Sequence, residues 1–183
     1  MKRREAQRYL DAYVDRLLAD AAELSGVFCI ENVPTLYIGG GTPSILGAER
    51  MEMLLAGLQA IFFTARRPSV PMEITVEANP ESLDENFLSA CKSCGVTRIS
   101  LGVQTFYEES RRAVHRTGDL SSEQIEQRME MLSQYYPGAF SVDLIAGLPL
   151  QDKAALLEDI GRLLAFEQAH VSLYSLVLED DTP

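Results

Sequence analysis

The segment Thr35–Ser44, TLYIGGGTPS, is a short apolar run that stops at three consecutive glycines and leads into a helix-like stretch. The same event recurs at three later places, ITVEANP at 74–80, ISLGVQ at 99–104 and VDLIAGLP at 142–149. A strand that ends in glycine or polar residues and feeds a helix is the repeating unit of a parallel barrel or an open α/β sheet. Because ligands of these folds bind at the carboxyl ends of the strands, the four segment ends predict where the site lies.

The composition of the 183-residue chain limits its classes of partner. A net charge of −11 argues against nucleic acid, whose binding needs a basic surface. No apolar run approaches the roughly 18 residues of a membrane span, and Met1–Glu5 lacks the apolar core of a signal peptide behind it. We therefore expect a cytoplasmic protein without a transmembrane segment. Several of the few basic residues cluster and predict a local positive potential that could bind an anionic group: Arg98, Arg111, Arg112, His115 and Arg116.

Apolar spacing predicts helices that alternate with strands along the whole chain. The predicted helices cover residues 5–23, 49–62, 83–94, 108–114, 122–135 and 153–166. The predicted strands cover residues 35–38, 73–78, 98–103, 140–145 and 170–177. This alternation favours parallel pairing with right-handed crossovers, and an antiparallel or edge-exposed sheet is the weaker alternative.

The strands themselves alternate between an apolar face and a polar or small face. In the third predicted strand, Ile99, Leu101 and Val103 oppose Ser100 and Gly102. The same parity places Val142 and Leu144 opposite Ser141 and Asp143, and Val171 and Leu173 opposite His170 and Ser172. A doubly wound sheet is apolar on both faces, whereas a barrel with a wet lumen packs only its outside on helices. The pattern therefore predicts a wide or incomplete barrel with a polar interior.

Polar residues at the strand ends are the candidate site. Parity points Glu77, Gln104 and Asp143 inward, and Asn79 follows the second strand. Buried polar groups need partners, and in a cavity the partner is usually ligand or water. The two carboxylates could accept hydrogen bonds from ribose hydroxyls or an ammonium group, and Gln104 offers both a donor and an acceptor.

Two further features could contribute to ligand binding. Arg116 could form a bidentate pair with a carboxylate, and the glycines at 39–41 would let a ligand approach the backbone. Structural alternatives stay open for every candidate. The glycines could form only a turn, the carboxylates could pair with Arg98, and Arg116 could be a solvated charge.

Other motifs for catalysis or metal binding are weak. The three cysteines, Cys29, Cys91 and Cys94, argue against a disulfide framework because their number is odd. The C-x-x-C pair at 91–94 has a metal or redox spacing, but it lies at the end of a helical pattern that Gly95 stops, and we favour a helix end. The sequence GGGTPS fits neither a Rossmann fingerprint nor a P-loop, and no serine lies in a nucleophile elbow.

Five segments occur in the order and spacing of one known family: YIGGGTPS at 37–44, VEANP at 76–80, RISLGVQTF at 98–106, DLIAGLP at 143–149 and SLYSL at 172–176. Together they resemble the radical S-adenosylmethionine proteins of the oxygen-independent coproporphyrinogen III oxidase family, over nearly the whole chain. The SLGVQTF form and the closing LEDDTP at 178–183 favour its heme-chaperone branch over the true oxidase. The resemblance implies an α/β fold, a partial (β/α)6 TIM-like barrel of the radical SAM type, which agrees with the polar interior.

The resemblance also implies S-adenosylmethionine as the cofactor. It implies that Gly39, Gly40 and Gly41 contact the methionine end of the cofactor and that Val177 lies near a backbone contact. The remaining positions that match the family's binding residues are Thr42, Glu77, Gln104, Arg116 and Asp143.

One departure from the family bears on mechanism. The family carries C-x-x-x-C-x-x-C after its first strand, and these thiolates hold the [4Fe–4S] cluster that binds S-adenosylmethionine. This sequence has no such motif and no predicted metal ligands. We therefore expect residues 1–183 to be a single incomplete radical SAM core domain that lacks the first strand, the cluster loop and the C-terminal domain. Such a chain would bind S-adenosylmethionine without cleaving it reductively.

Two other functions stay open. The first is a cluster-free heme- or tetrapyrrole-binding protein on the same fold, with His115 or His170 as an axial ligand and a heme-accepting protein as partner. A packed or solvated histidine is the simpler interpretation of either residue. The second is an unrelated barrel enzyme that uses Glu77 and Asp143 as an acid–base pair.

Overall fold

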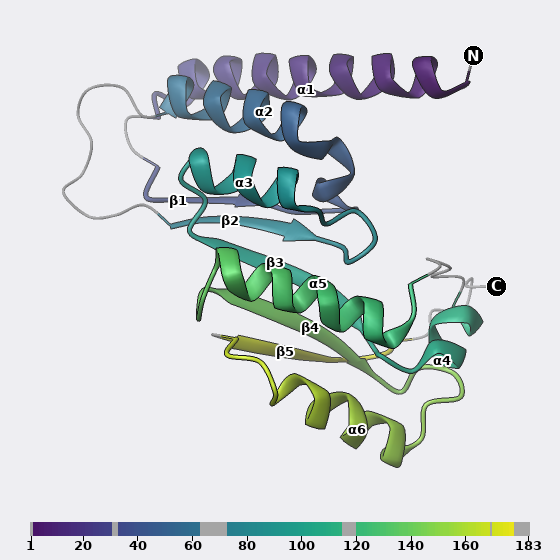
Figure 1. The fold of residues 1–183 in the computed structure, drawn as a ribbon. Helices are drawn as coiled ribbons and strands as arrows, with labels where there is room; N and C mark the ends of the chain where they lie inside the picture. The colour runs from purple at the N-terminus through teal and green to yellow at the C-terminus, as the bar shows by residue number, and fades with distance from the viewer. Residues whose placement is uncertain (1, 31–32, 63–72, 115–119, 169, 178–183) are drawn as a thin grey trace. The chain divides into compact units, whose positions relative to one another are not determined.

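The computed structural model describes residues 2–30, 33–62, 73–114, 120–168 and 170–177. The chain divides into two compact units (Figure 1). The first contains the residues up to Val76 together with Asp84–Thr97, and the second contains Glu77–Leu83 and the residues from Arg98 onward.

The first unit packs helices on a parallel pair of strands. Its elements are α1 (Lys2–Val27), β1 (Thr35–Ile38), the 3-10 helix η1 (Pro43–Leu46), α2 (Gly47–Phe62), most of β2 (Glu73–Ala78) and α3 (Glu85–Ser93). The strands β1 and β2 are parallel, with Thr35 opposite Glu73. The buried side chains of this unit include Val14, Met51, Leu55, Phe87 and Leu88. A Cβ on Gly57 of α2 would lie 2.5 Å from Leu18 Cδ2, so glycine permits the close approach of α1 and α2.

The second unit is a parallel three-strand array with helical connections. Its elements are β3 (Arg98–Gln104), α4 (Glu108–Ala113), α5 (Ser122–Tyr135), β4 (Phe140–Ala146), α6 (Lys153–Leu163) and β5 (His170–Ser175). β4 pairs in parallel with β3 and with β5. Its core combines Ile99, Leu101, Val142 and Leu144 of the strands with apolar residues of α5, namely Ile125, Met129 and Leu132.

Side-chain caps fix where several helices begin. The Asp84 carboxylate accepts a hydrogen bond from the Phe87 amide at 2.7 Å, and the Asp152 carboxylate accepts one from the Ala155 amide at 2.8 Å. Ser121 and Gln124 form a reciprocal capping box at the start of α5. Each cap satisfies amides that the first helical turn leaves without a partner.

The predicted alternation of helices and strands is confirmed throughout the described residues, and three predicted elements match without a shift: 35–38, 73–78 and 122–135. The predicted helix at 153–166 ends earlier, at Leu163, because Ala165 and Phe166 donate to the carbonyls three residues before them. Such bonds tighten the last turn and end the α-helix. The last strand ends at Ser175, two residues before the predicted end.

The predicted face pattern is correct in the centre of the second unit and wrong at its edge. Ile99, Leu101 and Val103 are buried, as parity predicts. On β5, however, Val171 is 39% exposed and Leu173 is 53% exposed, although both were expected to pack under helices. β5 is an outer strand, and no helix follows it among the described residues.

The polar face of the strands is also more buried than the water-filled barrel interior that the sequence predicted. Thr75, Ser100 and Ser141 on that face are each at most 6% exposed. Ser141 Oγ donates to Ser100 Oγ at 2.9 Å, so these hydroxyls satisfy one another instead of binding solvent. The polar interior therefore begins only toward the carboxyl ends of the strands, where Gln104 and Asp143 are half-buried.

Candidate functional site

The carboxyl end of β3 contains an irregular turn centred on Gln104. The pairing of β3 with β4 shifts between Gly102 and Gln104, so Val103 forms a bulge. Gln104 has a φ of +70°, and the Thr105 amide donates to the Val103 carbonyl at 2.9 Å. A hydrogen bond across one residue with positive φ is the mark of the rarer, strained form of γ-turn. The structure thus holds Gln104 in a backbone conformation that non-glycine residues rarely adopt.

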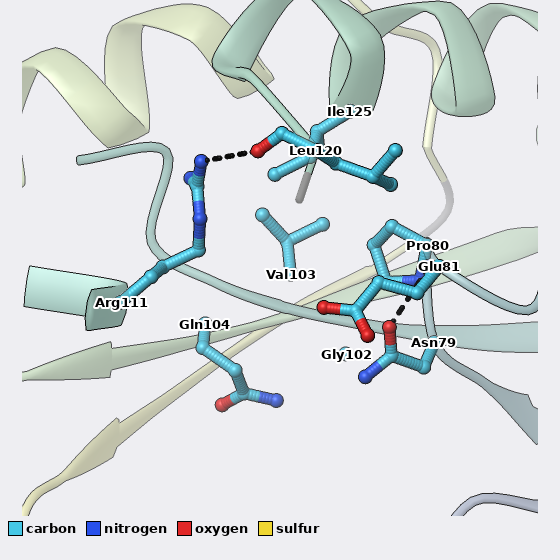
Figure 2. Close-up of a pocket in the computed structure, with 9 residues that line it drawn as sticks. All are labelled: Asn79, Pro80, Glu81, Gly102, Val103, Gln104, Arg111, Leu120 and Ile125. Carbon is cyan, nitrogen blue, oxygen red and sulfur yellow. Dashed lines mark hydrogen bonds between the residues drawn. The ribbon is translucent and has the colours of Figure 1, made fainter. Parts of the chain in front are cut away.

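Gly102 makes room for the Gln104 side chain. A Cβ placed on Gly102 would lie 2.8 Å from Gln104 Nε2 and 3.7 Å from the Ala78 carbonyl oxygen. The amide of Gln104 therefore occupies the position that a side chain at 102 would need, on the polar face. Figure 2 shows Gln104 and Val103 leaving the strand in opposite directions.

A pocket of about 20 Å³ opens beside this turn and is lined by the Asn79–Glu81 turn, Gly102–Gln104, Arg111, Leu120 and Ile125 (Figure 2). The Glu81 amide donates to Asn79 Oδ1 at 3.0 Å, which shapes the Asn79 turn. A space of this size holds about one water molecule. The pocket alone therefore does not accommodate a cofactor, but it brings polar groups from two strand ends together.

Asp143 lies next to this turn on β4. It is the register partner of Gly102 on one side and of Ser172 on the other. Side chains of directly paired strand residues share a face, so the Asp143 carboxylate lies on the face where a Gly102 side chain would point. The Gln104 amide occupies that position over Gly102 and therefore lies on the same polar face. Asp143 Oδ2 accepts a hydrogen bond from Ser100 Oγ at 3.2 Å, which orients the half-buried carboxylate.

The other predicted binding residues of the second unit lie at neighbouring strand ends. Glu77 is half-buried near the end of β2. Val177 follows β5 and is 77% exposed. The Leu176 amide donates to the Ala146 carbonyl at 2.8 Å, which ties the segment before Val177 to the end of β4. Arg116 and His115 lie outside the described residues.

The glycine run belongs to the first unit and forms the turn after β1. Gly40 and Gly41 have φ values of +88° and +63°, and no atom lies within 4 Å of a Cβ built on either. The run is exposed, Thr42 is half-buried, and the Thr42 carbonyl accepts a hydrogen bond from the Ile45 amide at 3.0 Å. A turn that requires glycine is thus confirmed, and the predicted ligand contact stays a prediction.

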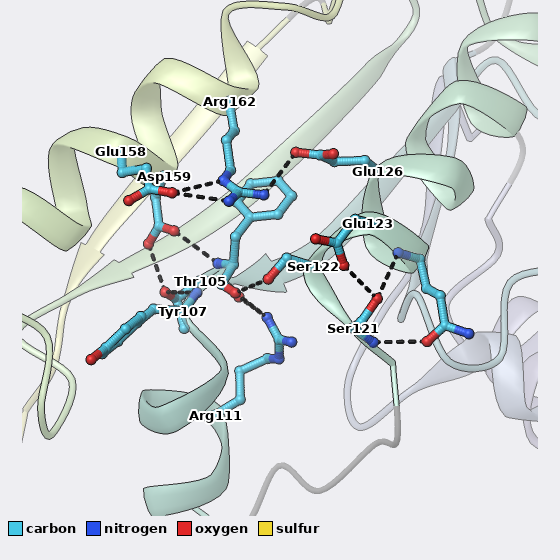
Figure 3. A network of polar contacts seen from close by, with 12 residues as sticks. Thr105, Tyr107, Arg111, Ser121, Ser122, Glu123, Glu126, Glu158, Asp159 and Arg162 are labelled. Atoms are coloured by element: carbon cyan, nitrogen blue, oxygen red, sulfur yellow. Dashed lines mark hydrogen bonds and ion pairs between the residues drawn. The ribbon is translucent and has the colours of Figure 1, made fainter.

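Sequence reasoning missed a buried carboxylate on α6. Asp159 is 2% exposed and accepts hydrogen bonds from Thr105 Oγ1 at 2.6 Å and from the Phe106 amide at 2.9 Å (Figure 3). Burial raises the pKa of Asp159, while these hydrogen bonds act in the opposite direction. A signal was present in the sequence, because Leu156, Asp159 and Leu163 follow helical spacing and place a charge on an otherwise apolar stripe.

Arg111 on α4 is a second buried charge at the same turn. Its guanidinium donates to the Thr105 carbonyl at 2.9 Å, the Phe106 carbonyl at 2.7 Å and the Leu120 carbonyl at 2.9 Å. Burial lowers its pKa. The basic cluster in the sequence suggested an anion site, but the structure uses Arg111 to hold backbone carbonyls.

The cysteines do not form a metal centre in the part of the chain that the structure describes. Cys91 is buried in α3, and burial raises the pKa of its thiol to about 12. Cys94 is the C-terminal cap of α3, and burial raises its pKa as well. Within the described ranges, no three His, Cys, Asp or Glu residues are grouped to hold a metal ion.

Among the described residues, no helix has both the length and the apolarity to cross a bilayer.

Comparisons with known proteins agree on one family. The model of the Radical SAM superfamily matches residues 4–163. The chain is 36% identical over 173 residues to the heme chaperone HemW of Lactococcus lactis, covering 94% of this chain and 43% of that protein. HemW of Escherichia coli is 34% identical over 173 residues, covering 94% of this chain and 44% of its own length. The chain thus spans less than half the length of these curated relatives.

A solved structure, the radical SAM coproporphyrinogen III oxidase HemN of Escherichia coli, matches with a TM-score of 0.81. The match has 27% sequence identity and covers 93% of this chain and 38% of that chain. The predicted α/β fold of the radical SAM type is therefore confirmed.

Proposed function

Because this chain belongs to the radical SAM superfamily, we propose that its second unit binds S-adenosylmethionine at the carboxyl ends of its strands. We assign it to a HemW-like protein of heme or porphyrin metabolism, on the basis of its relatives. The observation that carries the proposal is the Gln104 turn: a strained backbone places an amide over Gly102, on the same face as the Asp143 carboxylate.

The residues fit the chemistry of this cofactor. S-adenosylmethionine presents ribose hydroxyls and an ammonium group that donate hydrogen bonds, and an adenine ring that both donates and accepts. The half-buried carboxylates of Glu77 and Asp143 can accept hydrogen bonds from the hydroxyls or the ammonium group. The Gln104 amide supplies both a donor and an acceptor, as the adenine ring requires. A side chain at position 102 would fill the space that Gln104 uses, so the absence of a Cβ is part of the site.

The remaining assignments rest on the resemblance alone. Arg116 would bind the cofactor's carboxylate, Val177 would offer a backbone contact, and Gly39, Gly40, Gly41 and Thr42 would contact the methionine end. Of these, Val177 and the Gly39–Thr42 turn are exposed or half-exposed in the structure, which leaves them accessible to a ligand.

We further propose that this chain binds S-adenosylmethionine without cleaving it reductively. In the superfamily, three cysteine thiolates hold the iron–sulfur cluster that supplies the electron for cleavage. The sequence has no C-x-x-x-C-x-x-C motif, and Cys91 is a buried thiol with a pKa near 12. The described residues therefore do not fit the cluster, and no step through it is assigned to this chain.

Heme binding through a histidine is the second candidate, supported by the name of the relatives. The described histidine argues against it, because His170 is the first residue of β5 and pairs with Ser141. It therefore lies at the opposite end of the strand from the candidate site.

Isothermal titration with S-adenosylmethionine tests the proposal. We expect one binding site on the chain and a dissociation constant weakened about tenfold by Gln104→Ala or Asp143→Asn, since each removes hydrogen bonds to the ligand. Glu130→Gln is the matched control, because it removes the same charge as Asp143→Asn from an exposed position of α5. No heat of binding, or equal affinity in all four proteins, would contradict the proposed site.

A further inference from the structure

The turn after β3 is held by a carboxylate from a distant part of the chain. Asp159 accepts hydrogen bonds from the Thr105 hydroxyl at 2.6 Å and the Phe106 amide at 2.9 Å, and the Thr105 hydroxyl in turn accepts one from the Tyr107 amide at 3.0 Å (Figure 3). All of these groups follow Gln104 directly in sequence. The Asp159 carboxylate thus holds Thr105, the last residue of the γ-turn, and the segment that follows it.

The same carboxylate reaches the turn after β4 through Gln151. Gln151 Nε2 donates to Asp159 Oδ2 at 3.4 Å and to the Ile145 carbonyl at 3.1 Å. Gln151 Oε1 accepts from the Gly147 amide at 2.8 Å. Asp159 therefore connects the strand ends that carry Gln104 and Asp143.

The conformation that Asp159 supports is not one that Gln104 would keep by itself. A glutamine with a φ of +70° is strained, and such conformations persist only where the surroundings over-determine them. A buried carboxylate is also unfavourable unless hydrogen bonds compensate it. The strained Gln104 backbone and the hydrogen-bonded Asp159 carboxylate meet at the same turn. Backbone strain of this kind concentrates at functional sites.

We infer that Asp159 is a positioning residue that holds the strained turn at Gln104 and thereby sets the affinity of the site for an adenosyl ligand. The statement about affinity rests on the proposed function. The statement about the turn does not, because it concerns the ligand-free protein. Asp159 itself is assigned no contact with the ligand.

Asp159→Asn is the informative substitution. The asparagine keeps the size of the side chain but replaces one acceptor oxygen by an NH2 group, which would face the donors of Thr105 and Gln151. Glu158→Gln makes the same charge change one residue away, at an exposed position that pairs with Arg162. Asp152→Ala removes the cap of α6 and serves as a control for lowered stability, because the Asp152 carboxylate accepts its hydrogen bond from the Ala155 amide of the helix.

Amide hydrogen exchange in the ligand-free protein is the first measurement. Its reporter is the Thr105 amide, which donates across the γ-turn to the Val103 carbonyl and does not touch Asp159. We expect this amide to exchange about tenfold faster in Asp159→Asn than in the wild type, and at the wild-type rate in Glu158→Gln and Asp152→Ala. Unchanged exchange in Asp159→Asn, or equal acceleration in Asp152→Ala, would overturn the inference.

A double-mutant cycle on S-adenosylmethionine affinity is the second measurement. We expect Asp159→Asn to weaken binding about tenfold in the wild type and to have little further effect in Gln104→Ala, because it acts through that side chain. Additive losses would overturn the inference about affinity. If the wild type binds no S-adenosylmethionine, the proposed function fails, and the exchange experiment alone decides the role of Asp159.

Thr105 provides a rescue test with a conservative pair. Thr105→Ser keeps the hydroxyl that Asp159 accepts from, whereas Thr105→Val keeps the shape and removes it. We expect Thr105→Val to reproduce the faster exchange and Thr105→Ser to stay near the wild type. The same exchange in both variants would contradict a role for this hydrogen bond.

Discussion

Asp159 and Arg111 hold the dipeptide Thr105-Phe106 from opposite sides. The carboxylate accepts a hydrogen bond from the Phe106 amide at 2.9 Å, and the guanidinium donates to the carbonyls of Thr105 and Phe106 at 2.9 and 2.7 Å. The two charges are buried, yet each is compensated by backbone dipoles. A turn fixed in this way is suited to hold a strained residue such as Gln104 directly before it.

Gly102→Ala is expected to disturb the site more than the fold. The added methyl would lie 2.8 Å from Gln104 Nε2, the far end of a flexible side chain, so the glutamine would move away. We expect S-adenosylmethionine affinity to fall about tenfold, while the free energy of unfolding changes by less than about 1 kcal/mol. Titration calorimetry and urea unfolding measure the two effects.

Gly161→Ala is the matched control for that substitution. Gly161 lies in α6, and nothing lies within 4 Å of a Cβ at this position. Alanine in a helix should raise the free energy of unfolding by about 0.5–1 kcal/mol and leave affinity unchanged. A similar loss of affinity in both variants would contradict a specific role for Gly102.

The pH dependence of stability should carry a contribution from Asp159. Burial raises its pKa above the ordinary value of 3.8, so the folded state binds this proton more tightly than the unfolded state. Its contribution to stability is therefore fully present below pH 3.8 and is lost as pH rises through the higher folded pKa. Arg111 and Glu158 are the neighbouring charges that modulate this titration.

Urea unfolding at several pH values measures this contribution. As pH rises from about 3.8, the unfolding free energy of the wild type should fall relative to that of Asp159→Asn. Glu158→Gln is the reference for an exposed carboxylate on the same helix. A difference that is independent of pH would show that the pKa of Asp159 is the same in the folded and unfolded protein.

Arg111→Lys is expected to destabilise the second unit. Lysine cannot reproduce the planar fork that donates to three carbonyls, and it leaves at least one of them buried without a donor. We expect the free energy of unfolding to fall by about 1–3 kcal/mol. Arg112→Lys is the control, because Arg112 is exposed and forms an ion pair with Glu108 one turn away on the same helix. Equal stability of the two variants would contradict the structural role.

Reductive cleavage is expected to be absent in this chain. After iron–sulfur reconstitution and addition of dithionite, 5′-deoxyadenosine should stay at the level of the blank, because the sequence lacks C-x-x-x-C-x-x-C. A radical SAM protein that carries the motif is the positive control, assayed by chromatography. If 5′-deoxyadenosine forms, the variant with Cys29, Cys91 and Cys94 replaced by serine identifies its source. Formation that persists in this variant would point to a contaminating enzyme, whereas formation that disappears in it would contradict the proposal.

Heme titration tests the second candidate function. His170 starts β5 away from the candidate site, so the absorption spectrum of added heme should be the same for the wild type and for the protein with both His115→Ala and His170→Ala. A spectrum that changes with the double substitution would favour axial ligation by histidine.

Much of the architecture was predictable because its signals are local. Apolar residues at helical or alternating spacing placed every described α-helix and strand of the two units, but not the 3-10 helix η1. The turn that GGGTPS allowed as an alternative at 39–41 is present. Parity also placed Gln104 and Asp143 on the polar face. The register pairing of Gly102 with Asp143 agrees for Asp143, and the Gln104 amide 2.8 Å from a Cβ on Gly102 agrees for Gln104. The exposed Val171 and Leu173 were not predicted, because alternation within a strand does not reveal whether another element covers it.

The sequence by itself determined which segments become helices and strands, because backbone periodicity depends on neighbours a few residues apart. It also determined which polar residues end the strands. Only the tertiary structure decided how those residues are held. Asp159 meets Thr105 across 54 positions of sequence, and the bulge at Val103 arises from pairing with β4. Such contacts depend on how distant segments pack, which no local pattern encodes.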